Sequence, residues 1–117
     1  MKGSGMTVRL NPAELAARLN ARWKRGLPAL AAQVLEDCNV YARDHTGALI
    51  QSSRGASDLK AGRLVWRTPY ARRVYYKGTP SRLHNPAASL RWCERARTAR
   101  LPAWQARAVR ILGGDDG

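Results

Sequence analysis

Two cysteines and two histidines are the side chains of this sequence that could hold a metal ion or act as a nucleophile with its base: Cys38, His45, His84 and Cys93. Structural zinc sites usually take their ligands as close pairs, roughly two to five residues apart, and neither the cysteines nor the histidines are paired in this way. A Cys–His nucleophile pair has no further motif in its favour. We therefore predict no metal site, with each cysteine acting as a small buried apolar side chain and each histidine lying in a loop or at a helix end.

The acidic residues give no catalytic pattern either. The chain has only eight Asp and Glu, of which Asp115 and Asp116 stand in its last three residues. Neither the paired carboxylates of a hydrolase nor the metal-binding set of a two-metal nuclease is evident. A Gly-rich phosphate loop is also missing. The sequence predicts a protein that is not an enzyme, with no catalytic residue and no cofactor.

The positive charge gathers in the second half of the chain. The formal net charge is +13, and residues 54–110 hold fourteen Lys and Arg against two Asp and Glu. Six aromatic residues are interleaved with these cations: Trp66, Tyr70, Tyr75, Tyr76, Trp92 and Trp104. Arginines among aromatic rings suit a single-stranded nucleic-acid groove, and they are also the residues in which protein interfaces are enriched. Sequence order leaves both interpretations open, together with a simply solvated charged face.

A long helix is expected to precede this basic half. The run Asn-Pro-Ala-Glu at 11–14 is a typical helix start, in which the Asn caps, the Pro takes the first helical position and the Glu can reach back to the cap. Apolar residues then recur at four-residue spacing, interrupted by Gly26 and Pro28. We predict one long broken helix, or two in succession, over about 12–44.

The middle of the chain changes period from near four to two. Residues 48–53 and 62–68 are short, partly alternating runs, and the polar, Gly-containing stretch 54–61 separates them. This pattern predicts a β-hairpin. Because an isolated hairpin is marginally stable in water, it would need the long helix, a further strand such as 7–10, or a neighbouring chain.

The remainder of the chain indicates helices again. A short helix is expected from Pro69 to before Gly78, then an irregular excursion over 79–88, and then helical segments starting at Ser89 and at Pro102. The predicted fold class is α+β, with a long broken N-terminal helix, a central β-hairpin or small antiparallel sheet, and C-terminal helices.

The length of 117 residues fits one domain with a modest core. We assign residues 6–112 to that domain, 1–5 to a cloning remnant and 113–117 to a flexible tail. No apolar run approaches the ~20 residues that span a bilayer, so we expect no membrane contact. Reduced thiols inside a cell are the default for such a chain.

The chain also contains an ordered set of motifs: Val34 to Tyr41 (VLEDCNVY), Thr46 to Leu49 (TGAL) with Ser52, Leu64 to Arg72 (LVWRTPYAR), Tyr75 to Gly78 (YYKG), Trp92 with Ala96, and Trp104. Over about residues 30–110, this set resembles the minor capsid proteins of tailed bacteriophages and prophages. The family tends to place a Pro shortly after the tyrosine that precedes the turn, whereas here Ala42 and Arg43 follow Tyr41.

The resemblance implies a structural subunit of the virion neck, present in the host cytoplasm during assembly. The implied partners are other phage neck proteins, namely the head-closure or adaptor protein, the tail terminator and the tail tube. It also implies a homo-oligomeric ring around the DNA exit path, where non-specific contact with packaged DNA is possible. A free nucleic-acid-binding protein that uses the basic half 54–110 is the alternative hypothesis.

The part of the motif set that we interpret as a protein interface comprises Trp66, Arg67, Pro69, Tyr70, Arg72, Arg73, Tyr75 and Tyr76. A Pro directly after an extended run fixes the direction in which the chain leaves it. Tyr70 and Tyr75 would then be presented in a set direction. Ordinary core packing stays open as the alternative for Trp66, Tyr70 and Trp92.

Overall fold

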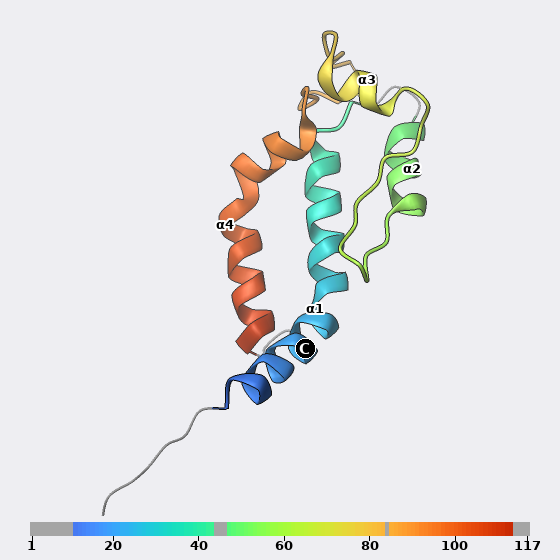
Figure 1. Cartoon of the computed structure of the whole chain (residues 1–117). Coiled ribbons are helices and arrows are strands. Elements are labelled where there is room, and N and C mark those ends of the chain that lie inside the picture. Colours follow the sequence, from blue (N-terminus) through green and yellow to red (C-terminus); the bar gives the residue numbers. More distant parts are fainter. Residues whose placement is uncertain (1–10, 44–46, 84, 114–117) are drawn as a thin grey trace, which may run out of the picture.

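The computed structural model describes residues 11–43, 47–83 and 85–113. Its four helices are α1 (Pro12–Val40), α2 (Ala48–Ala56), α3 (Ala71–Tyr76) and α4 (Trp92–Gly113). Figure 1 shows α1 and α4 side by side, with α2 on the other side of α1 and α3 at the end of the pair. Several predictions concern residues outside the described ranges. These are the placements of His45 and His84, the strand suggested over 7–10, the assignment of 1–5 to a cloning remnant, and the tail after Gly113.

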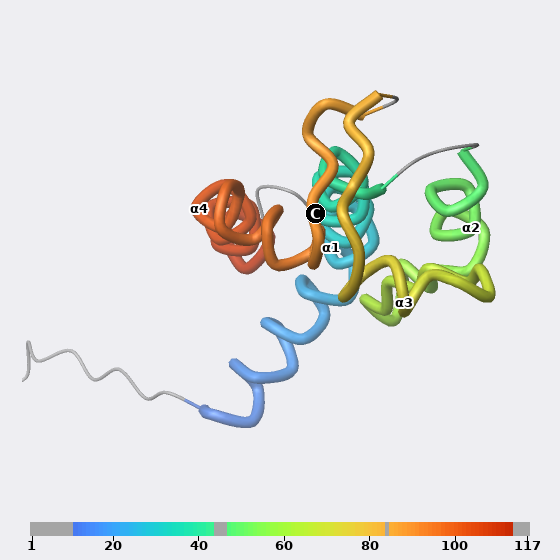
Figure 2. Tube along the Cα trace, turned by 90° about the horizontal axis from the view of Figure 1, so that it is seen from above, coloured from blue at the N-terminus to red at the C-terminus, as the bar shows by residue number. Residues whose placement is uncertain are grey.

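The helix start predicted at residues 11–14 is confirmed, because α1 begins at Pro12. Asn11 caps the helix, because its side-chain oxygen accepts the backbone N–H of Glu14 at 3.2 Å. The Glu14 carboxylate does not return to the cap and instead pairs with Arg18, one turn further on, at 2.8 Å. α1 is one continuous helix despite Pro28. Figure 2 shows its N-terminal part leaving the axis of the rest, as expected where a proline removes a helical hydrogen bond.

The predicted central β-hairpin is wrong, and with it the α+β class. Residues 48–56 form α2, and the only sheet-type pairing among the described residues is one isolated bridge between Asp58 and Arg63. Leu49 and Ser53, four residues apart, are the buried positions of α2. The pattern of apolar and polar residues over 48–53 is thus compatible with a helix that buries one face as well as with a strand, because six residues are too few to separate the two periods.

Residues 64–68 are extended, yet they pair with side chains rather than with a second strand. The hydroxyl of Ser57 accepts the backbone N–H of Val65 at 2.9 Å, and the hydroxyl of Ser52 accepts that of Arg67 at 3.0 Å. Ser52 lies in α2 and Ser57 directly follows it. Their hydroxyl groups accept the backbone N–H groups of the segment 64–68, which would pair with a neighbouring strand in a sheet. The fold is a helical one in which an extended segment runs along α2.

The C-terminal helices of the prediction are a single helix, α4, which passes through Pro102 without a restart. It packs along α1. A Cβ atom on Gly26 of α1 would lie 2.5 Å from Ile111 of α4, so the two helices approach closely there. Trp104 also donates its indole N–H to Asp37 at 2.7 Å, and Arg107 donates to Gln33 at 3.1 Å.

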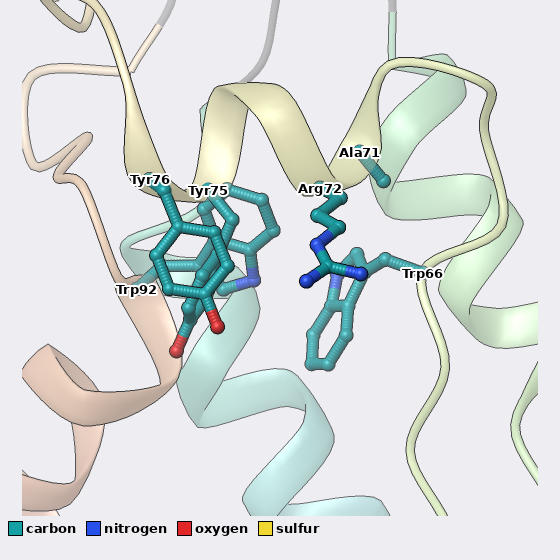
Figure 3. Close-up of a pocket in the computed structure, with 6 residues that line it drawn as sticks. All are labelled: Trp66, Ala71, Arg72, Tyr75, Tyr76 and Trp92. Carbon is teal, nitrogen blue, oxygen red and sulfur yellow. The ribbon is translucent and has the colours of Figure 1, made fainter.

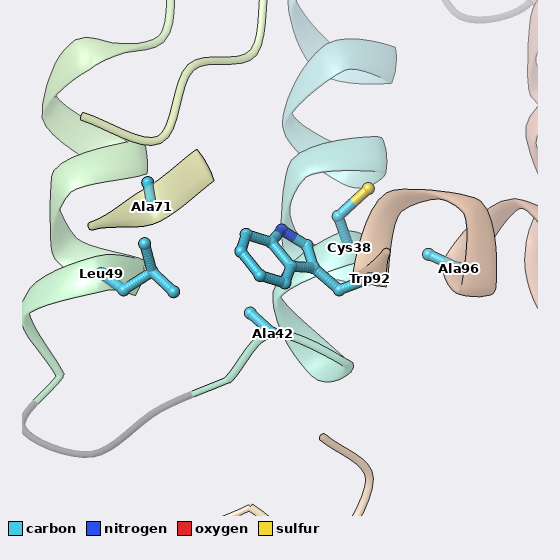
Figure 4. Close-up of a cluster of buried hydrophobic side chains, with 6 residues drawn as sticks. All are labelled: Cys38, Ala42, Leu49, Ala71, Trp92 and Ala96. Atoms are coloured by element: carbon cyan, nitrogen blue, oxygen red, sulfur yellow. The ribbon is translucent and has the colours of Figure 1, made fainter. Parts of the chain in front are cut away.

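The main core lies where the end of α1, the start of α4, α2 and α3 meet (Figure 4). One large ring and several small side chains fill it: Cys38, Ala42, Leu49, Ala71, Trp92 and Ala96. Trp92 is 1% exposed. Three alanines of the cluster, Ala42, Ala71 and Ala96, allow the helices to approach the Trp92 indole closely. Core packing, the alternative left open for Trp92, is confirmed.

Candidate functional site

The eight residues predicted to form an interface occupy α3 and the segment that leads into it; we call this surface the α3 face. Arg67, Pro69, Tyr70, Arg72, Arg73 and Tyr76 are exposed, whereas Trp66 and Tyr75 are half-buried. α3 begins after a turn in which the carbonyl of Thr68 accepts the N–H of Ala71 at 3.2 Å. Ala71 faces the core and anchors the helix, which leaves its arginines directed to solvent.

A pocket of about 220 Å³ opens on this face. Its walls are Trp66, Ala71, Arg72, Tyr75, Tyr76 and Trp92, which we call the aromatic pocket (Figure 3). Four of these six belong to the predicted interface. Ala71 and Trp92 were not assigned to it, and Trp92 reaches the site from α4, sixteen residues beyond the end of α3. Sequence spacing had placed this indole inward, which is correct for its burial but gave no indication that it also lines a surface pocket.

The rings of the aromatic pocket are packed on one another edge to face. Tyr75 and Trp92 have centroids 4.6 Å apart with planes at 82°, and Trp66 and Trp92 are 5.9 Å apart at 67°. Tyr76 joins the set through Tyr75 at 4.8 Å. The guanidinium of Arg91 lies over the ring of Tyr76, 5.4 Å from its centroid. The rings are thus held in a fixed arrangement.

A chain of hydrogen bonds fixes the orientation of Trp66. Its indole N–H donates to the side-chain oxygen of Asn39 at 2.9 Å, and the Asn39 amide donates to the hydroxyl of Ser53 at 3.0 Å. Both Asn39 and Ser53 are buried, and Ser53 in turn donates to the carbonyl of Ile50. This polar relay connects α2 and α1 to the wall of the pocket, and each buried donor in it has an acceptor.

A second depression, of about 250 Å³, is lined by Arg43, Arg73, Val74, Lys77 and Gly78. Here Arg43 holds the end of the short helix, because its guanidinium donates to the carbonyls of Val74 at 2.9 Å and Lys77 at 2.6 Å. A six-residue helix has little stability of its own. The Arg43 guanidinium stabilises it by donating hydrogen bonds to carbonyl groups at its C-terminal end, where no further helical N–H is available. No sequence pattern indicated this role, since Arg43 is more than thirty residues from its acceptors.

The expected irregular excursion between α3 and α4 is fastened to the core. The Asn85 amide donates to the carbonyls of Val40 and Ala42, both at 2.9 Å. The backbone N–H of Arg91 donates to the carbonyl of Tyr75 at 2.7 Å. These bonds place Arg91, which has a φ of 49°, beside α3.

The two cysteines meet in the core as neighbours on α1 and α4. A hydrogen bond with Cys93, together with burial, raises the pKa of the Cys38 thiol, so Cys38 stays protonated. Burial and the nearby Cys93 also raise the pKa of Tyr75 to about 12. Within the residues that the structure describes, no three His, Cys, Asp or Glu side chains gather as metal ligands, and no helix is long and apolar enough to cross a membrane.

The arrangement is that of a small helical protein with an aromatic pocket and exposed arginines at one end of the α1–α4 pair. The sequence matches the family model described as "Minor capsid protein" over residues 6–112, nearly its whole length, and the chain belongs to this family. Membership makes it a structural component of a bacteriophage virion, which implies a non-enzymatic role. Comparison with curated proteins and with solved structures finds no match.

Proposed function

We propose that this minor capsid protein is a neck subunit, a head–tail connector that joins the portal-side head-closure assembly to the tail. The α3 face is the observation that carries the proposal. It concentrates exposed Tyr and Arg at one end of the α1–α4 pair, and these residue types dominate the binding energy of protein interfaces. A rigid platform with such a surface suits a subunit that must dock in one orientation.

The charge of the platform indicates the character of its partners. Residues 54–110 carry a formal net charge of +12, and Arg67, Arg72 and Arg73 are exposed on the α3 face. Opposite charge on the partner would speed docking and exclude wrong partners. Neighbours in the neck, namely the head-closure protein or the tail terminator, would present acidic surface to this face, with further copies and packaged DNA close by.

Complementation of a phage that lacks this gene product tests the proposal. In the test variant Arg67, Arg72 and Arg73 are all changed to Gln, and in the control Lys60, Arg63 and Arg97, which are exposed elsewhere, are changed in the same way. We expect the control to restore infectious particles and the test variant to yield separate heads and tails by electron microscopy. Joined, infectious particles made without the protein would refute a connector role.

Free nucleic-acid binding is the second candidate, because the same exposed arginines could neutralise phosphates. The packing of the rings disfavours it, since the edge-to-face contacts and Arg91 occupy aromatic surface on which bases would stack. Fluorescence anisotropy with a labelled thymidine 20-mer separates the two candidates. A connector should show only weak binding that disappears at physiological salt, whereas tight binding under those conditions would favour the nucleic-acid role.

A further inference from the structure

The indole N–H of Trp92 is a hydrogen-bond donor without a partner in the part of the chain that the structure describes. Trp92 is 1% exposed, and no acceptor for its Nε1 atom exists among the described residues. Buried donors are almost always paired, because an unpaired one loses its bond to water without a replacement. The other indole of the pocket obeys this rule, since Trp66 donates to Asn39. Trp92 is therefore a buried donor for which the described residues supply no acceptor.

Trp92 is one of the residues that line the aromatic pocket, and its Nε1 atom is itself buried. In Figure 3 the ring nitrogen of Trp92 lies on the side of the indole that is toward Arg72 and Trp66. Arg72 is exposed and supplies the positive charge among the residues that line the pocket. A neutral donor and a guanidinium on the walls of one cavity match a ligand atom that accepts from both and carries negative charge. The rest of the lining is aromatic or aliphatic and would surround an apolar stem.

The size of the cavity narrows the ligand further. Pockets for cofactors and small molecules usually measure roughly 300–1,000 Å³, and this one is about 220 Å³. It can admit one side chain, with a carboxylate at the tip and methylene groups along the walls. A nucleotide would need more room and an open ring face for its base, and a phosphate would favour more cationic partners than the single Arg72.

We infer that the aromatic pocket binds a glutamate or aspartate side chain on an acidic segment of a partner protein, with the carboxylate bridging Arg72 and the indole N–H of Trp92. This inference rests on the proposed function, in which the α3 face docks on acidic partners. It goes further by naming one side chain, one pocket and the two donors that would recognise the carboxylate.

Nuclear magnetic resonance of the full chain with short peptides tests the inference. The probe is the acetylated, amidated peptide Ala-Leu-Glu-Leu-Ala, and its neutral match has Gln in place of Glu. The four tryptophans give indole N–H signals that can be followed separately, and Trp92→Phe identifies one of them. We expect the Glu peptide to move the Trp92 signal downfield as the N–H gains an acceptor, and the Gln peptide to bind at least about tenfold more weakly.

Two variants separate recognition from loss of structure. Arg72→Gln should weaken binding of the Glu peptide at least about tenfold, whereas Arg97→Gln, which removes the same charge from an exposed site on α4, should change it less than about twofold. Circular dichroism checks that both variants fold. Equal response to the Glu and Gln peptides, equal effects of the two variants, or no response at all would each overturn the inference.

A thymidine oligonucleotide that moves the Trp92 signal more strongly than the Glu peptide would also overturn it, in favour of a phosphate ligand. Failure of the connector role is recognised separately, by particles that join without the protein. If Arg72→Gln leaves joining intact and the peptides are not discriminated, the pocket assignment fails while the connector role stands.

Discussion

Gly26 is the residue that allows Ile111 to lie against α1. A Cβ atom at this position would be 2.5 Å from one side-chain carbon of Ile111 and 2.6 Å from another. Replacement by Ala gains ~1 kcal/mol of helix propensity, but overpacking of a core contact costs ~1–3 kcal/mol. We therefore expect Gly26→Ala to lower the free energy of unfolding, and urea denaturation will measure the change.

Gly55 provides the matched control. It also lies inside a helix, α2, but a Cβ atom there would meet nothing within 4 Å. Gly55→Ala should therefore keep or raise stability by up to ~1 kcal/mol, because only helix propensity changes. If both variants lose stability equally, close packing at Gly26 is not the cause.

Local residue effects were predictable from the sequence, and long-range ones were not. The N-cap at Asn11 follows from residue types within one turn, and the structure confirms it. The predicted interface residues all lie within the short stretch 66–76, so residue types alone could identify them as a group. Arg43, which follows α1, and Trp92, which begins α4, both contact α3 or the pocket beside it. Both are far from α3 in the sequence, so their spacing does not predict these contacts. The parts of the site that Trp92 and Arg43 form therefore depend on tertiary packing.

Among the elements, long helices were predicted better than short segments. A 29-residue helix shows its apolar stripe over many turns, whereas the six residues 48–53 match two periods equally well. The partial alternation of residues 62–68 predicts a hairpin strand, which is wrong, because Val65 and Arg67 donate to serine hydroxyls and the described residues form no sheet. Pro102 was interpreted as a boundary, yet α4 continues through it.

The ion pair between Arg54 of α2 and Glu36 of α1 predicts that the stability of the fold depends on pH. Arg54 holds Glu36 through two hydrogen bonds of 2.7 and 3.1 Å, which lowers the pKa of Glu36. A carboxylate with a lowered pKa in the folded state stabilises the fold above its unfolded pKa, near 4.5, and this contribution is lost as the pH falls through the folded value. Both side chains are about half exposed, so the effect is small.

Glu36→Gln should therefore be slightly less stable than the parent at pH 7, and the difference should shrink below pH 4.5. Thermal unfolding of both proteins between pH 3 and 7 measures it. The pair Glu14 and Arg18, exposed on α1, offers the control, because Glu14→Gln removes an ion pair within one helix without touching α2. A constant difference at every pH would contradict the proposed attachment.

For the whole molecule, the uneven charge makes association depend on salt. The net charge of +12 in residues 54–110 acts at long range at low ionic strength, and salt screens it within a Debye length of ~8 Å at physiological concentration. We expect binding of the chain to purified heads that lack it to slow as sodium chloride rises, mainly through the association rate. Surface plasmon resonance over a salt series measures that rate.

The two Gln triple variants sharpen the same experiment, since they carry equal net charge. The variant of Arg67, Arg72 and Arg73 should have a much shallower salt dependence than the variant of Lys60, Arg63 and Arg97. If the association rates of the two variants depend equally on salt concentration, the total charge of the chain, and not the position of the arginines on the α3 face, determines the association rate.

The polar relay from Ser53 through Asn39 to Trp66 draws on three separate parts of the chain. α1 supplies the middle member, α2 the first, and the segment before α3 the last. A subunit with only its two long helices assembled therefore has no finished pocket wall. If the pocket is where a partner is recognised, binding therefore requires that α2 and the segment before α3 have already packed against α1.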